Sequence, residues 1–124
     1  MLGNADVVAN VAVKDMSKAR AFYEGVLGLE PVERQQDQVT TYRSGKTRVN
    51  VYVSQFAGTN KATTLTWAVP DATTAATALA SKGVRFEHYD MPGVTREGDM
   101  HVGYGMKTAW FKDPDGNILQ VLSA

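Results

Sequence analysis

The sequence predicts an α+β fold made of two copies of one βαβββ module. Two observations support this prediction. Residues 7–15 read Val-Val-Ala-Asn-Val-Ala-Val-Lys-Asp and residues 63–71 read Thr-Thr-Leu-Thr-Trp-Ala-Val-Pro-Asp, so each is a strand-like run that ends at an Asp. Each run is followed by an amphipathic stretch and a glycine. Asp15 and Asp71 are 56 positions apart, nearly half the chain. A repeated unit of this kind implies a pseudo-two-fold fold whose chemistry lies in the cleft between the copies.

The first module is expected over residues 5–55. The valine-rich run at 7–13 predicts a buried strand, and Asp15 or Ser17 is suited to cap the next helix. Gly28 is a natural end for that helix. The apolar stripe of the helix has helical spacing and consists of Ala19, Phe22, Tyr23, Val26 and Leu27.

Three short strands complete the first module. They are expected at residues 30–36, 38–44 and 47–54, with a hairpin turn at Gly45-Lys46 between the last two. The polar stretch 55–61 contains a glycine and is interpreted as the linker between the modules.

The second module is expected over residues 62–124. A strand at 63–69 leads into a helix capped by Asp71 and ended by Gly83. Strands are expected at 84–89, 106–112 and 118–122, the last two joined by a turn at 113–117. The glycine-rich stretch 90–105 is interpreted as a mobile loop or irregular extension.

Composition limits the class of protein. The chain has 124 residues, the size of one domain, and 44% of them are hydrophobic. Thirteen basic and thirteen acidic residues cancel, which gives no electrostatic case for nucleic acid. There is no Cys, no apolar run long enough to span a membrane and no visible signal peptide. We therefore expect a single cytoplasmic domain with no nucleic-acid or membrane partner.

Two segments resemble the vicinal oxygen chelate superfamily, which contains glyoxalase I, extradiol dioxygenases, fosfomycin-resistance enzymes and bleomycin-binding proteins. They are Val-Lys-Asp-Met-Ser-Lys-Ala-Arg-Ala-Phe-Tyr at 13–23, followed by Val-Leu-Gly-Leu at 26–29, and Ala-Trp-Phe-Lys-Asp-Pro-Asp-Gly-Asn at 109–117. The resemblance implies that the mixed sheets curl into half-open barrels, whose cups hold the ligand. It also implies a homodimer.

The resemblance places the family's metal ligands at three positions that lack them here. A His on the first strand corresponds to Val8, its counterpart in the second module to Thr64, and a Glu on the last strand to Gln120. Divalent metals need imidazole, carboxylate or thiolate ligands. We therefore expect no metal and no cofactor. The exception would be a shifted divalent site built from His88, Asp90, Asp99 and His101.

Strand alternation predicts what lines the cup instead. Asn10 shares the strand face of Val8, and Thr66 shares that of Thr64, while Gln120 is itself a ligand position. On the fourth strand, Asn50 and Tyr52 are left to face the cup. For each candidate the alternative to ligand binding is a purely structural role, in the sheet, the core, a loop or a dimer contact. The candidate ligand-binding residues are Val8, Asn10, Tyr42, Asn50, Tyr52, Thr64, Thr66, His101, Tyr104, Trp110 and Gln120.

Three functions remain open from the sequence. The first is a metal-free protein that binds or sequesters a small neutral or aromatic molecule, for which a neutral cup is suited. The second is an enzyme, either a metal-dependent lyase, isomerase or dioxygenase with an atypical site, or a metal-free one that uses His101 or Tyr104 as acid or base. The third is an accessory domain without a ligand. Because the family's metal ligands are absent, the sequence favours the metal-free binding protein. No catalytic residue is assigned.

Overall fold

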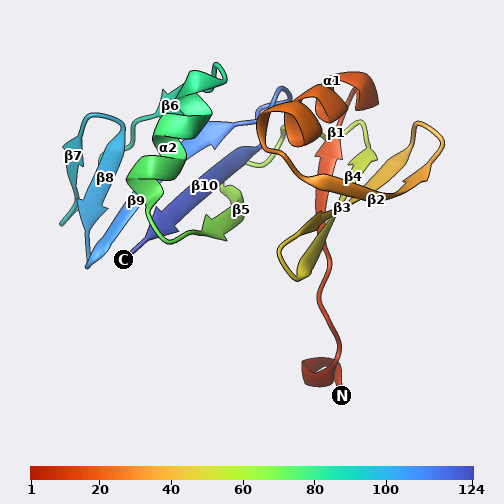
Figure 1. Ribbon diagram of the computed structural model, residues 1–124, viewed down its shortest axis with the longest axis horizontal. Coiled ribbons are helices and arrows are strands. Elements are labelled where there is room, and N and C mark those ends of the chain that lie inside the picture. The colour runs from red at the N-terminus through yellow and green to blue at the C-terminus, as the bar shows by residue number, and fades with distance from the viewer. The chain divides into compact units, whose positions relative to one another are not determined.

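The structure is a computed structural model that describes all residues, 1–124, and divides them into two compact units. The first unit comprises residues 1–59 and the second residues 60–124. Each unit has its own mixed sheet and its own helical segment (Figure 1). The predicted α+β class and the repeated strand–helix–strand order are therefore confirmed. Both sheets are curled and neither closes into a barrel.

The first unit holds a four-stranded sheet. After the short turn η1 (Leu2–Asn4), its elements are β1 (Ala9–Val13), α1 (Met16–Arg20), η2 (Ala21–Val26), β2 (Glu30–Gln35), β3 (Val39–Ser44) and β4 (Thr47–Val53). The strand order is β1-β4-β3-β2, with β1 parallel to β4 and the other pairs antiparallel. The hairpin turn expected at Gly45 is present, and Gly45 has the positive φ, 57°, that such a turn requires.

The helical segment of the first unit begins as predicted and continues differently. The Asp15 side chain accepts hydrogen bonds from the backbone N–H groups of Ser17 and Lys18, at 2.8 and 3.4 Å. Hydrogen bonds, first from the Ser17 hydroxyl, hold the pKa of Asp15 below its ordinary value. After Arg20 the α-helix gives way to the π-helical turn η2. The segment ends at Gly28, as expected, with φ of 73°.

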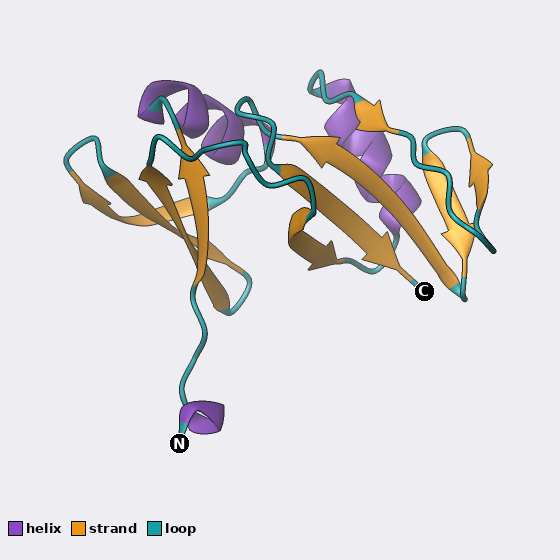
Figure 2. Ribbon diagram, turned by 180° about the vertical axis from the view of Figure 1, so that it is seen from behind, coloured by secondary structure: helices purple, strands orange, loops and turns teal.

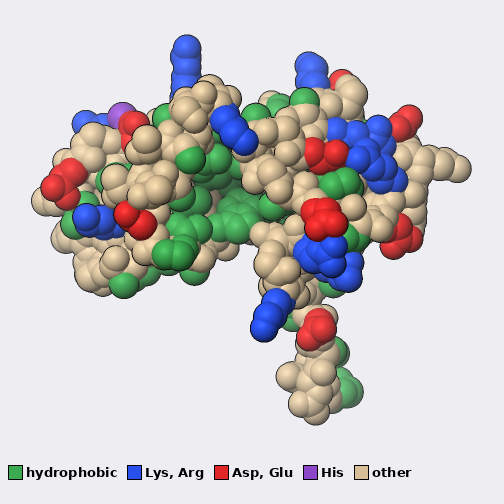
Figure 3. Space-filling model, viewed as in Figure 1, with side chains coloured by type: hydrophobic (Ala, Val, Ile, Leu, Met, Phe, Trp, Pro, Cys, Tyr) green, Lys and Arg blue, Asp and Glu red, His purple; other side chains and the backbone are tan.

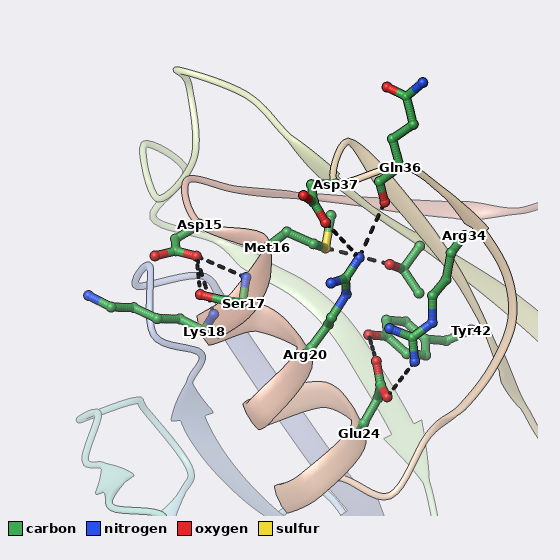
Figure 4. Close-up of polar contacts among 11 residues, drawn as sticks. Asp15, Met16, Ser17, Lys18, Arg20, Glu24, Arg34, Gln36, Asp37 and Tyr42 are labelled. Atoms are coloured by element: carbon green, nitrogen blue, oxygen red, sulfur yellow. Dashed lines mark hydrogen bonds and ion pairs between the residues drawn. The ribbon is translucent and has the colours of Figure 1, made fainter.

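Tyr42 anchors the helical segment to the sheet. It is fully buried, and its ring stacks on Tyr23 with 6.1 Å between centroids. Its hydroxyl donates to Glu24 Oε2 at 2.7 Å, while Arg34 pairs with Glu24 Oε1 at 2.8 Å. Figure 4 shows Glu24 reaching from the helical segment toward both partners. Burial, and then the hydrogen bond to Glu24, raise the pKa of Tyr42.

The second unit holds a larger sheet and one helix (Figure 2). Its elements are β5 (Thr63–Ala68), α2 (Ala72–Ser81), β6 (Phe86–Glu87), β7 (Thr95–Glu97), β8 (Met100–Gly103), β9 (Met106–Lys112) and β10 (Ile118–Ser123). The order is β5-β10-β9-β8-β7, with β6 also paired to β9. β5 is parallel to β10, which repeats the β1–β4 relation of the first unit.

The helix cap and the last turn of the second unit are confirmed. Asp71 accepts hydrogen bonds from the N–H groups of Thr73 and Thr74, at 3.0 and 3.4 Å. Its pKa is lowered, mainly by hydrogen bonds from Thr74. At the turn between β9 and β10, the buried Asp113 carboxylate accepts from the side-chain amide and the backbone N–H of Asn117. This carboxylate therefore holds the turn together.

The prediction of an irregular loop at 90–105 was wrong. Residues 95–97 and 100–103 form β7 and β8, which pair with each other, and β8 continues the sheet on β9. The strand expected at 84–89 is only two residues long. The second unit therefore contains one hairpin, β7–β8, that the sequence did not predict.

Charged side chains of both signs are spread over the surface. Figure 3 shows basic and acidic groups near one another on both units, with no field of a single sign on the visible face. None of the helices has the length and apolar character needed to cross a bilayer.

Candidate functional site

The second sheet has two chemically different faces. Helix α2 packs on β9 and β10, and Phe111, Leu119 and Val121 are buried. Side chains alternate along a strand, so Trp110 and Gln120 point to the face opposite these residues. They are only partly buried, and they lie directly across from each other in the β9–β10 register. This face therefore carries the candidate site.

A cavity of about 530 Å³ opens on this face. Its floor comes from β8, β9 and β10, and its rim from the segment before β7 and the β8–β9 turn. No Lys, Arg, Asp or Glu side chain lines it. The lining residues are Met91, Pro92, Val94, His101, Gly103, Tyr104, Met106, Thr108, Trp110, Gln120 and Leu122.

His101 is the one histidine that lines the cavity, and its side chain is buried, with 2% exposed. Its Nε2 accepts a hydrogen bond from the backbone N–H of Tyr89 at 2.9 Å. A backbone N–H can only donate, so Nε2 carries a lone pair and the ring is neutral. Its Nδ1 is buried and has no hydrogen-bond partner within the protein.

Three aromatic rings hold this part of the cavity together. His101 meets Trp110 edge to face, with 4.8 Å between centroids and 83° between planes. Tyr89 meets Trp110 in the same way at 5.4 Å and lies 6.3 Å from His101. Such pairs add to the energy of burial. Burial raises the pKa of the Tyr89 hydroxyl above its ordinary value.

The polar groups of Gln120 and Trp110 on this face both have partners on β5. The Thr66 hydroxyl donates to Gln120 Oε1 at 2.7 Å. The Trp110 indole N–H donates to the Thr63 hydroxyl at 3.1 Å. Thr64, which shares the strand face of Thr66, has a buried hydroxyl with no partner. Gln120 and Trp110 are therefore fixed in place by neighbours on β5.

Tyr104 stands at the mouth of the cavity in an unusual backbone conformation. It is 80% exposed, and its hydroxyl donates to the Pro92 carbonyl at 2.9 Å. Tyr104 and Gly105 form the two-residue turn between β8 and β9, with φ of 54° and 73°. Glycine adopts such angles freely, whereas a bulky residue rarely does. Strained residues of this kind often belong to functional sites.

The structure places four of the predicted residues in this cavity, namely His101, Tyr104, Trp110 and Gln120. Thr66 is hydrogen-bonded to Gln120 at its edge, and Thr64 lies on the same strand. The remaining five predicted residues belong to the first unit.

In the first unit, the polar predicted residues form a row across the sheet. Asn10, Asn50 and Thr41 are register partners on β1, β4 and β3. Thr41 donates to Asn50 Oδ1 at 2.7 Å, and Asn50 donates to Asn10 Oδ1 at 3.3 Å. Tyr52, on the same face of β4, and Val8, before β1, are 37% and 40% exposed. This face of the sheet is open.

Tyr42 lies on the other face of the first sheet. Its register partner is Val49, which is buried, and its ring packs on Tyr23 of the helical segment. The structure thus gives Tyr42 a place in the core beneath the helical segment.

The residues at the family's metal positions do not fit a metal. Val8 has no donor atom, Thr64 offers a neutral hydroxyl, and Gln120 Oε1 already accepts from Thr66. Of the shifted set, only His88 and Asp99 meet, at 2.8 Å, on the surface. No three His, Asp or Glu side chains gather into a possible metal site.

Sequence reasoning missed most of the rim. Met91, Pro92, Val94 and Gly103 lie in the stretch that was expected to be irregular. An alternating pattern in β9 could have indicated Met106 and Thr108, because both share the strand face of Trp110.

Comparison with known proteins supports this fold. The family model of the glyoxalase/bleomycin resistance protein/dioxygenase superfamily matches residues 6–121. No functionally curated protein matches the chain.

Several solved structures share the fold over nearly the whole chain. Lactoylglutathione lyase from Agrobacterium tumefaciens is similar with a TM-score of 0.72 and 18% identity, over 98% of this chain and 94% of that one. A superfamily member from Sphaerobacter thermophilus aligns over 100% of both chains, with a TM-score of 0.69 and 23% identity. A glyoxalase/bleomycin resistance protein from Streptomyces sp. CB03234 has a TM-score of 0.63 and 18% identity, over 94% of this chain and 98% of that one.

Proposed function

The chain belongs to the glyoxalase/bleomycin resistance protein/dioxygenase superfamily, and we propose that it binds or sequesters a small neutral or aromatic organic molecule without a metal. The observation that carries this proposal is the cavity of about 530 Å³ in the second unit. It has a size typical of small-molecule sites, which are mostly apolar with a few placed polar groups.

The charge of the cavity supports a neutral ligand. None of its lining side chains is a carboxylate, an ammonium or a guanidinium group, and His101 is held neutral by the Tyr89 N–H. A charged ligand would lose its hydration on entry and find no opposite charge there. A neutral ligand avoids that cost.

The aromatic and thioether groups support a flat ligand. Trp110 and Tyr104 line the cavity together with Met91 and Met106. Aromatic faces and methionine sulfur atoms both make favourable contacts with ligand rings. Methionine also adapts its shape, so this cavity is suited to a class of related molecules.

His101 is poorly placed to act as a general base. The lone pair of its Nε2 is already engaged by the Tyr89 N–H. A base needs a free lone pair within hydrogen-bond reach of the proton that it removes. The geometry therefore favours binding over metal-free acid–base chemistry at this residue.

Nuclear magnetic resonance of the two tryptophans tests the proposal. Trp110 lines the cavity and Trp67 does not, so the Trp67 indole is an internal control. Titration with a panel of neutral bicyclic and tricyclic aromatics should shift the Trp110 indole N–H resonance saturably and leave that of Trp67 nearly unchanged. The added compound should be recovered unaltered.

Three outcomes would contradict the proposal. If no compound shifts Trp110, the cavity is not a site for this ligand class. If equal shifts occur at both indoles, binding is non-specific. If the compound is converted during incubation, the protein is an enzyme rather than a binding protein.

A further inference from the structure

Part of the cavity rim is a segment of chain that belongs to no strand. Residues 88–94 connect β6 to β7, and we call them the rim segment. Three of them line the cavity, namely Met91, Pro92 and Val94. Within the segment, the Val94 N–H donates to the Met91 carbonyl at 3.2 Å, a local bond that does not join the segment to the sheet. Contacts made by side chains of the sheet therefore decide where the segment lies.

Two side chains of the sheet bind the backbone of the rim segment. His101 Nε2, on β8, accepts from the Tyr89 N–H at 2.9 Å, and the Tyr104 hydroxyl donates to the Pro92 carbonyl at 2.9 Å. Tyrosine hydroxyls keep their hydrogen up to about pH 10, whereas an imidazole nitrogen accepts only while it carries a lone pair. Histidines change charge between about pH 5 and pH 8. The bond to His101 is therefore the one that depends on pH near neutrality.

Protonation of His101 and its bond to Tyr89 exclude each other. An imidazolium carries a hydrogen on both ring nitrogens and accepts none. A hydrogen on Nε2 would point at the Tyr89 N–H, and Nδ1 is buried without a hydrogen-bond partner. A buried charge without partners is costly. The ring is therefore expected to take up a proton only where the rim segment has moved away from it.

The charged groups around His101 do not offset this cost. Arg96, its register partner on β7, is itself a cation. His88, with 6.4 Å between ring centroids, engages the Asp99 carboxylate at 2.8 Å. The closed arrangement therefore requires a neutral His101. The other groups near the ring are the Glu87–Lys112 ion pair, at 3.3 Å, the exposed Asp90, which has no ion pair, and the uncharged Thr108 and Trp110 on β9.

We propose that His101 is a pH-sensitive latch, which holds the rim segment closed while neutral and releases it on protonation, so that the cavity mouth opens. The open segment binds one proton more than the closed one, so a fall in pH favours opening. An exposed histidine has a pKa of about 6.5, so the open population should rise about tenfold between about pH 7.5 and about pH 5.5. The opening itself concerns only the fold, whereas release of a small molecule by it rests on the proposed function.

Hydrogen exchange of the Tyr89 amide, followed by nuclear magnetic resonance on the full chain, measures the opening. Its protection factor is already corrected for the pH dependence of exchange itself, and it should fall about tenfold between the two pH values. The amides of β10, a strand paired on both sides, report unfolding of the whole unit and should keep their protection. Protection of Tyr89 that does not change with pH, or that falls together with that of β10, would overturn the latch.

Two matched variants assign the effect to one histidine. His101→Gln cannot be protonated in this range, and its amide oxygen can still accept from the Tyr89 N–H, so protection of Tyr89 should no longer depend on pH. His88→Gln removes the neighbouring histidine, which pairs with Asp99 and not with the rim backbone. The pH dependence should persist in His88→Gln. Its loss there, or its persistence in His101→Gln, would overturn the role of His101.

A measurement on the wild-type chain does not depend on how the variants fold. Nitrogen-15 spectra of the histidine side chains should show His101 neutral, with an unprotonated Nε2, for as long as the Tyr89 amide is protected. A hydrogen found on Nε2 at the higher pH would contradict the latch. So would a His101 that becomes protonated while Tyr89 stays protected.

A ligand without a titratable group separates the latch from the proposed function. 9-Fluorenone is a neutral tricyclic aromatic, so any effect of pH on its binding comes from the protein. It should dissociate faster at the lower pH from the wild-type chain and equally fast at both pH values from His101→Gln. Equal rates in the wild-type chain would overturn control of the cavity by the rim segment. If neither 9-fluorenone nor the wider aromatic panel binds, the proposed function fails, while pH-dependent protection of Tyr89 still establishes the latch.

Discussion

Gly103 lies against the backbone of Gly93 so closely that no side chain fits between them. A Cβ atom on Gly103 would be 2.6 Å from the Gly93 carbonyl oxygen and 3.1 Å from the Val94 Cα. Because Gly93 is followed by Val94, which lines the cavity, this contact joins the rim to strand β8. The shape of the cavity mouth therefore depends on the absence of one methyl group.

Gly103→Ala should lower the free energy of unfolding by about 1–3 kcal/mol, because backbone atoms must move to admit the methyl group. Chemical denaturation measures this change. Gly25→Ala is the control, since a Cβ atom there would meet nothing within 4 Å. A Gly103→Ala protein as stable as Gly25→Ala would contradict the close contact.

Tyr104→Asn should weaken aromatic ligand binding several-fold while changing stability by less than about 1 kcal/mol. Asparagine tolerates the positive φ of this turn better than tyrosine, which offsets the lost hydrogen bond to Pro92. Titration with 9-fluorenone and a thermal melt measure the two effects. Phe56→Ala, at a 68% exposed aromatic of the first unit, should leave binding unchanged. Unaltered affinity in Tyr104→Asn would exclude a role for Tyr104 at the cavity mouth.

Tyr42→Phe should destabilise the protein by about 1.5–3 kcal/mol, because it removes a part-buried hydrogen bond to the carboxylate of Glu24. Urea unfolding at pH 7 measures the loss. Tyr52→Phe is the matched control, since its side chain is 37% exposed and no protein hydrogen bond of its hydroxyl is lost. Equal stability of the two variants would show that the Tyr42–Glu24 bond contributes nothing.

The same bond predicts a pH dependence at the alkaline end. The pKa of Tyr42 is raised from 10.0 in the folded chain, first by burial and then by Glu24. Its contribution is complete below pH 10 and is lost as the pH rises toward the folded pKa, because the unfolded tyrosine ionises first. Wild-type stability should fall more steeply than that of Tyr42→Phe above about pH 10. Parallel curves for the two proteins would refute this linkage.

Divalent metals should not stabilise the chelator-stripped protein. A metal bound at about a thousand times its dissociation constant adds roughly 4 kcal/mol, which raises the melting midpoint on the order of 10 °C. Melts with excess Ni²⁺, Co²⁺, Mn²⁺, Fe²⁺ or Zn²⁺ should lack such a shift, given the donor set at Val8, Thr64 and Gln120. A large shift with any one of them would point to an atypical metal site.

The protein should be a homodimer in solution, as the family resemblance implies. The first unit leaves one sheet face open, where Tyr52 is 37% exposed. Light scattering after size exclusion should give twice the mass of the chain at micromolar concentration. A monomer at all concentrations would reject this prediction.

Local patterns were enough to predict the frame of the fold. Asp15 and Asp71 are capping residues that act through the N–H groups two and three positions later, so they are readable from the sequence. Strand alternation left Asn50 on the face away from the core, and the structure buries its neighbours Val49 and Val51 while Asn50 is half-buried on the other face. Such features depend on neighbours in the chain and need no knowledge of distant contacts.

Distant contacts decided the candidate site. The hairpin of β7 and β8 forms because β8 finds an edge on β9, which the glycine-rich stretch 90–105 does not reveal by itself. His101 Nε2 accepts from the backbone N–H of Tyr89, twelve positions away, and His101 Nδ1 is buried without a hydrogen-bond partner. Tyr42 was predicted to line the cup because it is aromatic and polar. Its register with the buried Val49 instead puts its side chain in the core. The sequence by itself therefore determined the module order, the caps and the missing metal ligands, because these follow from residue type and spacing. Only the tertiary structure decided which polar atoms lack partners and where the cavity lies, because hydrogen bonding and packing are settled between residues far apart in the chain.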